Sequence, residues 1–209
     1  MRVTALEPES RSGGVRVQLD ERPFGTIGTA DVVELGLAVD RRVDATTEAE
    51  LVRRAENFSA RAVALRMLAA RALSSVEIQR RLVRKGHSKP AAEAAVQGLL
   101  AVGLINDQQF AQHYARTRSR RQRFGPRRLL ADLRRMGVSE KDATAAVRDA
   151  LEADGVDPRA VLREAAAKKA RSLQGLDPET ARRRLRAYLL RRGFGGSEVA
   201  SVVKDAVPR

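Results

Sequence analysis

The chain's 209 residues suffice for one or two ordinary domains, and its 43% apolar content is enough to build hydrophobic cores. The lack of cysteine excludes disulfides and thiolate metal sites, and the seven aromatic residues favour thin, closely packed helices over a large β-sandwich. The net charge of +14 is uneven: residues 1–58 hold 8 basic against 11 acidic residues, and residues 59–209 hold 32 against 15. Such a basic body predicts a polyanionic partner, either nucleic acid or the acidic face of a protein.

The chain carries no predicted membrane segment or leader. Its first ten residues contain no apolar signal core. The longest apolar run, residues 91–105, is interrupted by Glu93 and Gln97 and is too short to span a bilayer. We therefore expect a cytoplasmic protein with no membrane partner.

Residues 1–45 predict a small N-terminal segment that contains a β-hairpin. Residues 3–6 and 14–19 alternate like short strands, and the polar sequence ESRSGG between them is typical of a turn. Residues 23–28, which begin with Pro23 and end with Gly28, predict a bend. A short helix is expected over residues 30–35.

A long helix is predicted to begin at Thr47 and to end near Leu73. Thr47 and Glu50 have the spacing of a capping box, in which the hydroxyl and the carboxylate each accept a backbone N–H. After this box, apolar residues recur at intervals of three and four, which is the period of one helical stripe. The predicted stripe consists of Leu51, Ala55, Phe58, Ala62, Leu65 and Ala69.

The rest of the chain contains a repeat that becomes visible when three glycines are aligned. The sequences LVRKG, LRRMG and LLRRG end at Gly86, Gly137 and Gly193. Each copy has an apolar residue eight positions before its glycine and a valine ten positions after it. A period of 51 and then 56 residues indicates a tandem array of structural units.

Each copy is predicted to form three helices. Ser74 with Glu77, Gly125 before Pro126, and Asp177 before Pro178 mark the start of the second helix, because an oxygen or glycine suits the cap and proline suits the first turn. The aligned glycines end that helix. Ser88, Ser139 and Gly195 open the third. We therefore predict a mainly α fold, with repeats at residues 46–105, 106–156 and 157–209 in an elongated array after the β-containing segment.

Basic side chains gather on one face of successive helices. In the helix after Pro126, the leucines and Met136 occupy one arc and four arginines occupy the opposite one. These faces lack matching acids apart from Asp132, which favours anion binding over an ordinary solvated surface. Only six of the forty basic residues are lysine; arginine makes forked contacts with phosphate or carboxylate, although a GC-rich genome produces the same bias. The candidate contact residues are Arg80, Arg81, Arg84, Lys85, Arg116, Arg120, Arg123, Arg127, Arg128, Arg134, Arg135, Lys168, Lys169, Arg183, Arg191 and Arg192.

Few residues suit catalysis or a metal. His87 follows the glycine that ends a helix, and His113 lies on a basic face, so both are interpreted as surface residues. Asn106 and Asp107 precede a helix and are explained by N-capping, with Gln109 as the box partner. No dense acidic cluster and no phosphate-binding loop occurs in the sequence. We therefore predict a protein that is not an enzyme and has no cofactor.

Several motifs resemble the RecX family of bacterial regulators. The sequence GLIND at residues 103–107, followed by Phe110, Tyr114, Arg118 and GP at residues 125–126, is similar to the family signature. Residues 74–86 and 190–194 resemble the family's first and last repeat motifs, and the likeness covers roughly residues 58–207.

This resemblance implies a non-catalytic regulator of homologous recombination and the SOS response. We expect the chain to be a monomer. Such proteins bind the RecA recombinase filament on single-stranded DNA and lower its ATPase, strand-exchange and coprotease activities. Single-stranded and double-stranded DNA are the expected nucleic-acid partners. Two other classes remain open: a DNA-binding helix-turn-helix transcription regulator, which needs a base-reading recognition helix, and a metal-dependent nuclease.

Overall fold

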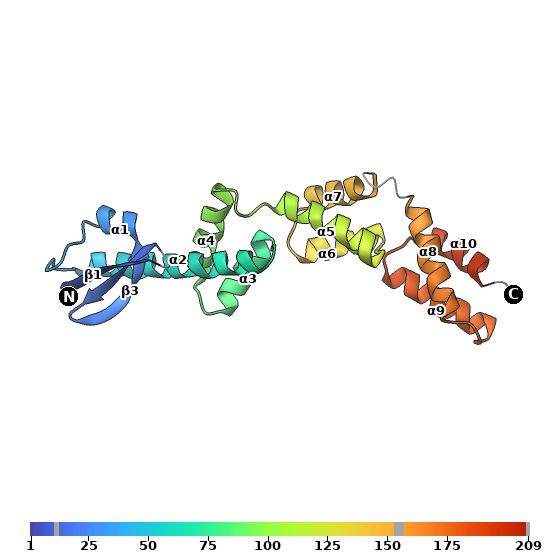
Figure 1. The fold of residues 1–209 in the computed structure, drawn as a ribbon, viewed down its shortest axis with the longest axis horizontal. Helices are drawn as coiled ribbons and strands as arrows, with labels where there is room; N and C mark the ends of the chain where they lie inside the picture. The colour runs from blue at the N-terminus through green and yellow to red at the C-terminus, as the bar shows by residue number, and fades with distance from the viewer. Residues whose placement is uncertain (11–12, 153–156, 208–209) are drawn as a thin grey trace. The chain divides into compact units, whose positions relative to one another are not determined.

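A computed structural model describes residues 1–10, 13–152 and 157–207 of the chain, and it confirms a mainly helical fold after a small β-sheet (Figure 1). The chain divides into two compact units, Met1–Ile105 and Asn106–Arg209. The predicted boundaries after residues 45 and 156 stay predictions, and the second of these falls beside residues 153–156, outside the described part. The elongated arrangement of the repeats also stays a prediction.

The N-terminal segment forms a three-stranded antiparallel sheet. Its strands are β1 (Val3–Glu9), β2 (Gly14–Leu19) and β3 (Arg22–Gly28), in the order β1-β2-β3. The bend predicted over residues 23–28 is wrong, because these residues belong to β3. Proline and glycine are tolerated there because β3 lies at an edge of the sheet and its pairing with β2 shifts register near Pro23. Arg11 and Ser12 of the predicted turn lie outside the described residues.

Two helices follow the sheet in the first unit. The short predicted helix is α1 (Thr29–Glu34), and the long one is α2 (Ala45–Ala70). The predicted cap of α2 is wrong: Asp44, not Thr47, is the N-cap, and its carboxylate accepts the Thr47 N–H at 2.7 Å. Glu50 forms ion pairs with Arg53 and Arg54 instead of closing a capping box, and these two guanidinium groups lower the pKa of Glu50 to about 2.

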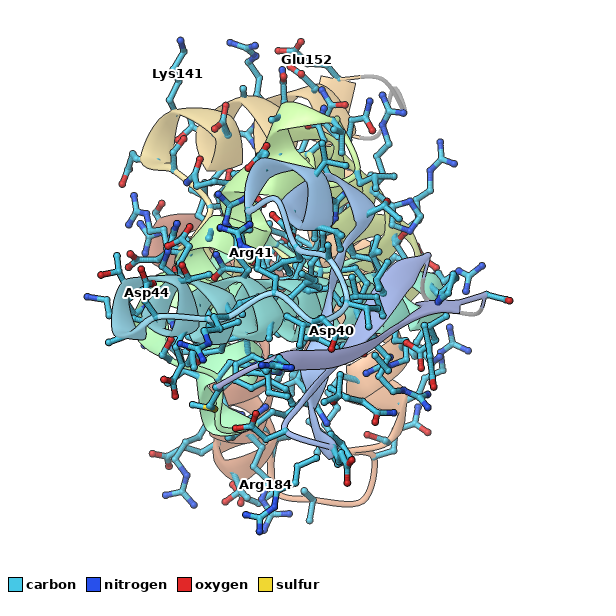
Figure 2. The ribbon with its side chains drawn as sticks, turned by 90° about the vertical axis from the view of Figure 1, so that its left-hand side faces the viewer. Asp40, Arg41, Asp44, Lys141, Glu152 and Arg184 are labelled. Carbon is cyan, nitrogen blue, oxygen red and sulfur yellow. The ribbon has the colours of Figure 1, made fainter. Side chains whose placement is uncertain are left out.

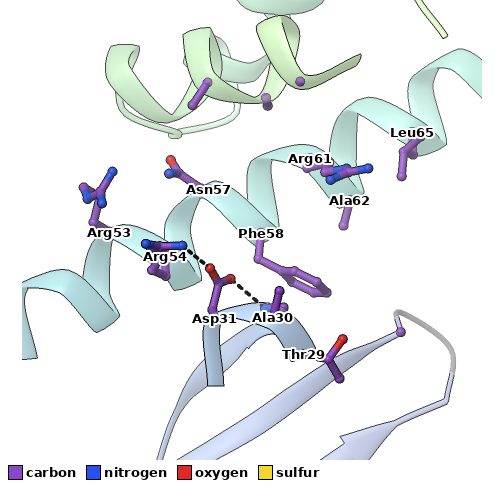
Figure 3. A pocket seen from close by; sticks show the side chains of 15 residues that line it. Thr29, Ala30, Asp31, Arg53, Arg54, Asn57, Phe58, Arg61, Ala62 and Leu65 are labelled. Atoms are coloured by element: carbon purple, nitrogen blue, oxygen red, sulfur yellow. Dashed lines mark hydrogen bonds and ion pairs between the residues drawn. The ribbon is translucent and has the colours of Figure 1, made fainter. Parts of the chain in front are cut away.

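Helix α2 packs into two different cores. Leu51 near its beginning is buried among the strands, and the ring of Phe58 points toward the sheet (Figure 3). A Cβ at Gly14 would stand 2.5 Å from that ring, so the glycine allows the close approach. The second half buries Ala60 and Ala64 against α3 and α4, as Figure 1 lets the reader follow.

The single apolar stripe predicted for α2 is therefore only partly right. Leu65 and Ala69, which continue the stripe in sequence, are exposed. The buried face rotates along the helix because the sheet and the first repeat approach α2 from different sides.

Three three-helix repeats make up the rest of the described chain. The first combines α2 with α3 (Ser75–Arg84) and α4 (Lys89–Ala101). The second consists of α5 (Asp107–Gln122), α6 (Pro126–Arg135) and α7 (Glu140–Glu152). The third consists of α8 (Pro158–Arg171), α9 (Pro178–Arg191) and α10 (Gly196–Ala206). Each repeat has its own core, and the aligned anchors Ile78, Leu82, Leu129, Leu133, Leu185 and Leu189 are fully buried.

The caps predicted within the three repeats are confirmed at the starts of α3, α4, α5, α6 and α10. The side chains of Ser74, Ser88 and Asn106 accept backbone N–H groups at the starts of α3, α4 and α5. Gly125 and Gly195 stand at the N-caps of α6 and α10. The aligned glycines at positions 86, 137 and 193 have φ of 96°, 83° and 87°, the left-handed conformation that ends a helix without a Cβ clash.

Candidate nucleic-acid interface

The first repeat presents its basic residues at the end of α3. Arg84 and Lys85 are exposed, and neither forms an ion pair in the described part of the chain. Arg80 is also exposed. Arg81 differs, because it is half-buried and its guanidinium donates to Glu77 Oε1 at 2.8 Å, an oxygen that also accepts from Arg71. Arg84 and Lys85 are therefore the cations of this helix that remain open to an anion.

Helix α5 carries predicted contact residues along its solvent side and at its end. Arg116 and Arg120 are exposed. Arg123 ends the helix in the left-handed conformation with φ of 49°, and its guanidinium forms an ion pair with Glu164 of α8. This hydrogen bond lowers the pKa of Glu164. Arg123 thus links the second and third repeats rather than facing solvent as a free cation.

A buried carboxylate orders the arginines of α6. Asp132 keeps 6% of its side-chain surface exposed and accepts from Arg128 Nε and Arg135 Nη2, each at 2.9 Å. The Tyr114 hydroxyl donates to the same carboxylate at 3.1 Å. Arg134 forms an ion pair with Glu140 at the start of α7. These contacts fix most of the guanidinium groups that the sequence placed on the α6 surface.

The expectation that the basic faces lack matching acids is therefore wrong for part of the set. The candidate residues that are paired with carboxylates are Arg81, Arg123, Arg128, Arg134 and Arg135. Asp132 lies three or four positions from two of them, a spacing that sequence could have related to them. Glu164 lies 41 positions from Arg123, so no local pattern could have predicted that pair.

The third repeat combines exposed cations with cations held over aromatic rings. Lys168, Arg183 and Arg191 are exposed, although Arg183 lies close enough to Asp177 to help lower the pKa of that carboxyl. Lys169 Nζ lies 5.6 Å from the centroid of the Tyr188 ring. The remaining candidates are thus distributed between solvent and the packing of α8 against α9.

Arg192 is a structural residue at the end of α9. It is half-buried, its guanidinium carbon lies 4.9 Å from the Tyr188 ring centroid and 5.9 Å from that of Phe124, and it donates to the Gln122 carbonyl. Since these contacts occupy both its charge and its planar face, Arg192 joins the two repeats of its unit instead of presenting a free site.

The end of α9 meets the beginning of α6 in a clasp made of backbone hydrogen bonds. The N–H of Gly125 donates to the Arg192 carbonyl at 2.7 Å, and the N–H of Arg127 donates to the Gly193 carbonyl at 3.2 Å. The guanidinium of Arg128 adds a bond to the Arg191 carbonyl at 3.3 Å. The first N–H groups of one helix and the last carbonyls of the other lack intrahelical partners, so each end satisfies the other.

Both glycines of this clasp are required by contact. A Cβ at Gly125 would stand 2.5 Å from the Gly193 carbonyl oxygen, and a Cβ at Gly193 would collide with the backbone of Arg128. The clasp brings the exposed residues Arg127 and Arg191 to one junction between the second and third repeats. The sequence predicted that Gly125 caps the start of a helix and that Gly193 ends one, but it did not predict this contact.

Part of the candidate set remains exposed and without a partner in the described chain, once ion pairs, ring contacts, carbonyl contacts and nearby carboxylates are considered. Lys168 and Arg183 are left out because they lie near Glu164 and Asp177. We call this subset the unpaired cations: Arg84, Lys85, Arg116, Arg127 and Arg191. They come from the first repeat and from both repeats of the second unit. Their guanidinium and ammonium groups can donate to phosphate oxygens without first breaking an internal salt bridge.

A cavity in the first unit lies outside the predicted set. It has a volume of roughly 730 Å³ between α1, α2 and α4, and Arg53, Arg54 and Arg61 line it together with apolar residues. Asp31 lies between Arg54 and the start of α1 and accepts the Gly28 N–H at 3.0 Å (Figure 3). This network fixes α1 against α2. Arg53 and Arg54 are paired with carboxylates, whereas Arg61 is exposed.

Residues 1–10, 13–152 and 157–207 contain no group of three or more histidines, aspartates or glutamates that could hold a metal ion. Within the same residues, none of the helices combines the length and the apolar character that crossing a bilayer requires. The helices carry charged side chains that project outward, such as those of Lys141 and Arg184 (Figure 2).

Protein-family models match all three repeats. The model described as the RecX first three-helix domain matches residues 60–99, the second matches residues 106–147, and the third matches residues 157–203. The chain belongs to the RecX family. The likeness that the motifs carried in sequence is thereby confirmed, and the repeat order of the RecX models is the order of the repeats in this structure.

Relatives and solved structures agree with membership of the RecX family. Proteins named Regulatory protein RecX from Amycolatopsis mediterranei and Pelodictyon phaeoclathratiforme are 33% and 31% identical; the alignments cover 70% and 68% of this chain and 82% and 84% of the relatives. A crystal structure of a regulatory protein RecX aligns over 98% of both chains with a TM-score of 0.75 and 21% identity. RecX from Lactobacillus salivarius covers 72% of this chain and 96% of its own, with a TM-score of 0.57 and 20% identity.

The N-terminal sheet lies outside the three RecX domain models, which begin at residue 60. It is nevertheless included in the fold shared with the crystal structure that covers 98% of this chain. The shared fold therefore extends from the sheet through all three repeats.

Proposed function

We propose that this RecX-family chain is a non-catalytic regulator that binds the RecA filament on single-stranded DNA and inhibits or destabilises it. The function lies in homologous recombination and the SOS response, in the cytoplasm. Family membership supports the regulatory role, and the unpaired cations support contact with a polyanion. The observation that carries the proposal is the distribution of these cations over three repeats whose cores are separately built.

The contacts would be several and individually weak. Each unpaired cation can bind one DNA phosphate or one carboxylate of a RecA subunit. Because the repeats are linked in one chain, binding by one repeat raises the effective concentration of the next at a neighbouring site. The clasp between Gly125 and Gly193 supports this mode, because it holds the cations of the second and third repeats in one unit.

RecA's DNA-dependent ATPase tests the proposal. We expect the rate of ATP hydrolysis on single-stranded DNA to fall as the protein is added from substoichiometric to equimolar amounts. The combined variant Arg116→Glu with Arg127→Glu is expected to inhibit less, because both changes reverse the charge of exposed residues.

A matched control uses Arg148→Glu, which reverses an exposed arginine already bound to Asp149 at 3.1 Å. This variant should inhibit like the parent. An unchanged ATPase rate at equimolar protein would contradict the proposal. Incubation with Mg²⁺ and labelled DNA in the absence of RecA tests the non-enzymatic part, since any metal-dependent cleavage would overturn it.

A further inference from the structure

The third repeat contains a groove that the proposed contacts do not use. It lies between α9 and α10 and has a volume of roughly 1240 Å³. Its apolar floor is formed by Ala187 and Leu190 of α9 and by Ala200 and Val203 of α10. Leu190 is 43% exposed and leaves apolar surface open to a partner.

The aligned position in the first repeat is closed by a hydrogen bond between its helices. Gln79 of α3 donates through Nε2 to Glu93 of α4 at 3.1 Å. The residues that align with this pair in the third repeat are Arg186 and Ala200. Alanine has no carboxylate, so Arg186 has no partner across the groove.

A second cross-link is absent from the third repeat as well. In the second repeat, Arg134 of α6 forms an ion pair with Glu140 at the start of α7. The aligned residues are Leu190 and Gly196. A Cβ at Gly196 would meet no atom within 4 Å, so this side of the groove is open. The Gln79–Glu93 bond belongs to the first repeat and the Arg134–Glu140 pair to the second. The third repeat can form neither, and it has exposed apolar surface and an unpaired arginine at these positions.

Basic side chains border the apolar floor. Arg186 and Lys204 are exposed, and in the described part of the chain neither forms a hydrogen bond or ion pair. Arg182 is held differently, because its Nε donates to the Val207 carbonyl at 2.9 Å and ties α10 to α9. The acids of the lining, Glu179 and Asp205, are outnumbered by the basic residues.

The apolar floor and its basic border favour a protein ligand over a nucleic acid. Bases bind single-strand proteins mainly by stacking on aromatic rings, and the groove lining contains no aromatic residue. An apolar floor instead suits aliphatic side chains spaced along one face of a helix. A second copy of this chain is disfavoured by its net charge of +14.

We propose that the groove between α9 and α10 binds a helical segment of a partner protein that places apolar side chains against Leu190 and carboxylates against Arg186 and Lys204. The contact adds to the proposed function, on which it rests for the presence of a protein partner. The groove would give the third repeat a protein contact distinct from the phosphate contacts of the unpaired cations.

A designed peptide tests this directly. The probe is a fluorescein-labelled helix of about 16 residues with leucines along one face and glutamates beside them, and fluorescence anisotropy measures its binding to the full chain with neither RecA nor DNA present. We expect Arg186→Glu and Ala200→Glu each to weaken binding by about tenfold or more, the first by charge reversal and the second by giving Arg186 an internal partner.

Arg184→Glu is the matched control, because it makes the same charge change on the same helix at a side chain that points into solvent outside the groove (Figure 2). It should change the affinity by about twofold or less. Leu190→Ser replaces Ala200→Glu in the peptide titration if the latter variant fails to fold. It removes an exposed apolar side chain from the groove floor and should also weaken peptide binding.

Three results would overturn the groove as a protein-binding site: no binding of the peptide by the parent chain, an equal loss in Arg184→Glu, or displacement of the peptide by an oligo-dT strand. The last would identify the groove as a nucleic-acid site. Because RecA is absent, a failed peptide titration leaves the ATPase result unaffected, and a failed ATPase assay leaves peptide binding unaffected.

Discussion

Asp132 is the residue on which the arrangement of the middle repeat depends most. It is the one acid within a run of arginines, and it is buried. It accepts hydrogen bonds from Tyr114, Arg128 and Arg135. A charge surrounded in sequence by cations thus becomes the internal partner that orients two of them and anchors α5 to α6.

Replacing Asp132 should destabilise the second unit moderately. We expect Asp132→Ala to lower the free energy of unfolding by about 1–3 kcal/mol, because the Tyr114 hydroxyl loses its acceptor while the guanidinium groups can turn to water. Tyr114→Phe should cost about 1 kcal/mol. Urea denaturation of both variants and of the double variant measures the coupling, and an effect of Tyr114→Phe that is unchanged in the Asp132→Ala background would rule out the contact as a source of stability.

Asp177 provides a second residue-scale prediction, concerning acid. It caps α9 by accepting the N–H groups of Glu179 and Thr180, and its hydrogen bonds to Thr180 lower its pKa below the ordinary 3.8. Since the folded pKa is the lower one, the carboxylate stabilises the fold fully above about pH 4 and progressively less as the pH falls through the folded value.

The test is a comparison with Asp177→Asn, which keeps a capping oxygen without a titrating charge. The difference in unfolding free energy between the two proteins should be constant from pH 7 to 5 and should shrink below pH 4. A difference that grows on acidification would contradict the lowered pKa of Asp177 and the stabilising role of its ionised form.

At the scale of the element, the clasp between α9 and α6 couples two helix ends. Gly193 has φ of 87° and lies against the backbone of Arg128. Gly175, in the turn before α9, has nearly the same φ of 89° but no atom within 4 Å of an added Cβ. The two glycines therefore separate the cost of left-handed backbone from the cost of the contact.

We expect Gly175→Ala to destabilise the chain by about 1 kcal/mol, as backbone strain alone requires. Gly193→Ala should cost about 2–4 kcal/mol, because the added methyl also forces the clasp apart. Hydrogen exchange at the Gly125 and Arg127 amides should accelerate in Gly193→Ala and not in Gly175→Ala. Equal destabilisation by the two changes would show that the contact contributes no stability.

Local contacts were predictable from sequence, and distant ones were not. Ser74 and Asn106 cap helices that begin one residue later, so the signal and its consequence lie within a single turn. The Arg123–Glu164 pair and the Gly125–Gly193 clasp join residues far apart in sequence, and no periodicity relates them. The basic faces could therefore be located in sequence, while the side chains that remain available on them required the structure.

The same reasoning explains the two errors at the beginning of the chain. Pro23 and the glycines near it have turn propensity, which the sheet edge overrides in β3. Asp44 and Thr47 are both good caps, and propensity does not decide between them. In the structure Asp44 is the cap and α2 begins at Ala45, three residues before Glu48, where a helix capped by Thr47 would begin.

At the scale of the whole molecule, fewer cations are available to a partner than the forty basic residues suggest, because many arginines are paired with carboxylates of the same chain. The unpaired cations number five, and they define the phosphate contacts that counterion release would report. Binding to a single strand should therefore depend on salt through this subset rather than through all forty basic residues.

Oligo-dT binding measured between low and moderate salt tests this. Five phosphate contacts predict a log–log slope of about −3.5, since each contact on a single strand contributes about −0.7. Arg116→Ala should make the slope shallower by about 0.7, because it deletes one exposed, unpaired cation. Arg134→Ala is the matched control: its guanidinium is already shared with Glu140, so it should change the slope by less than about half as much. A slope near zero, or equal changes in the two variants, would mean that ion pairing does not select the contact residues.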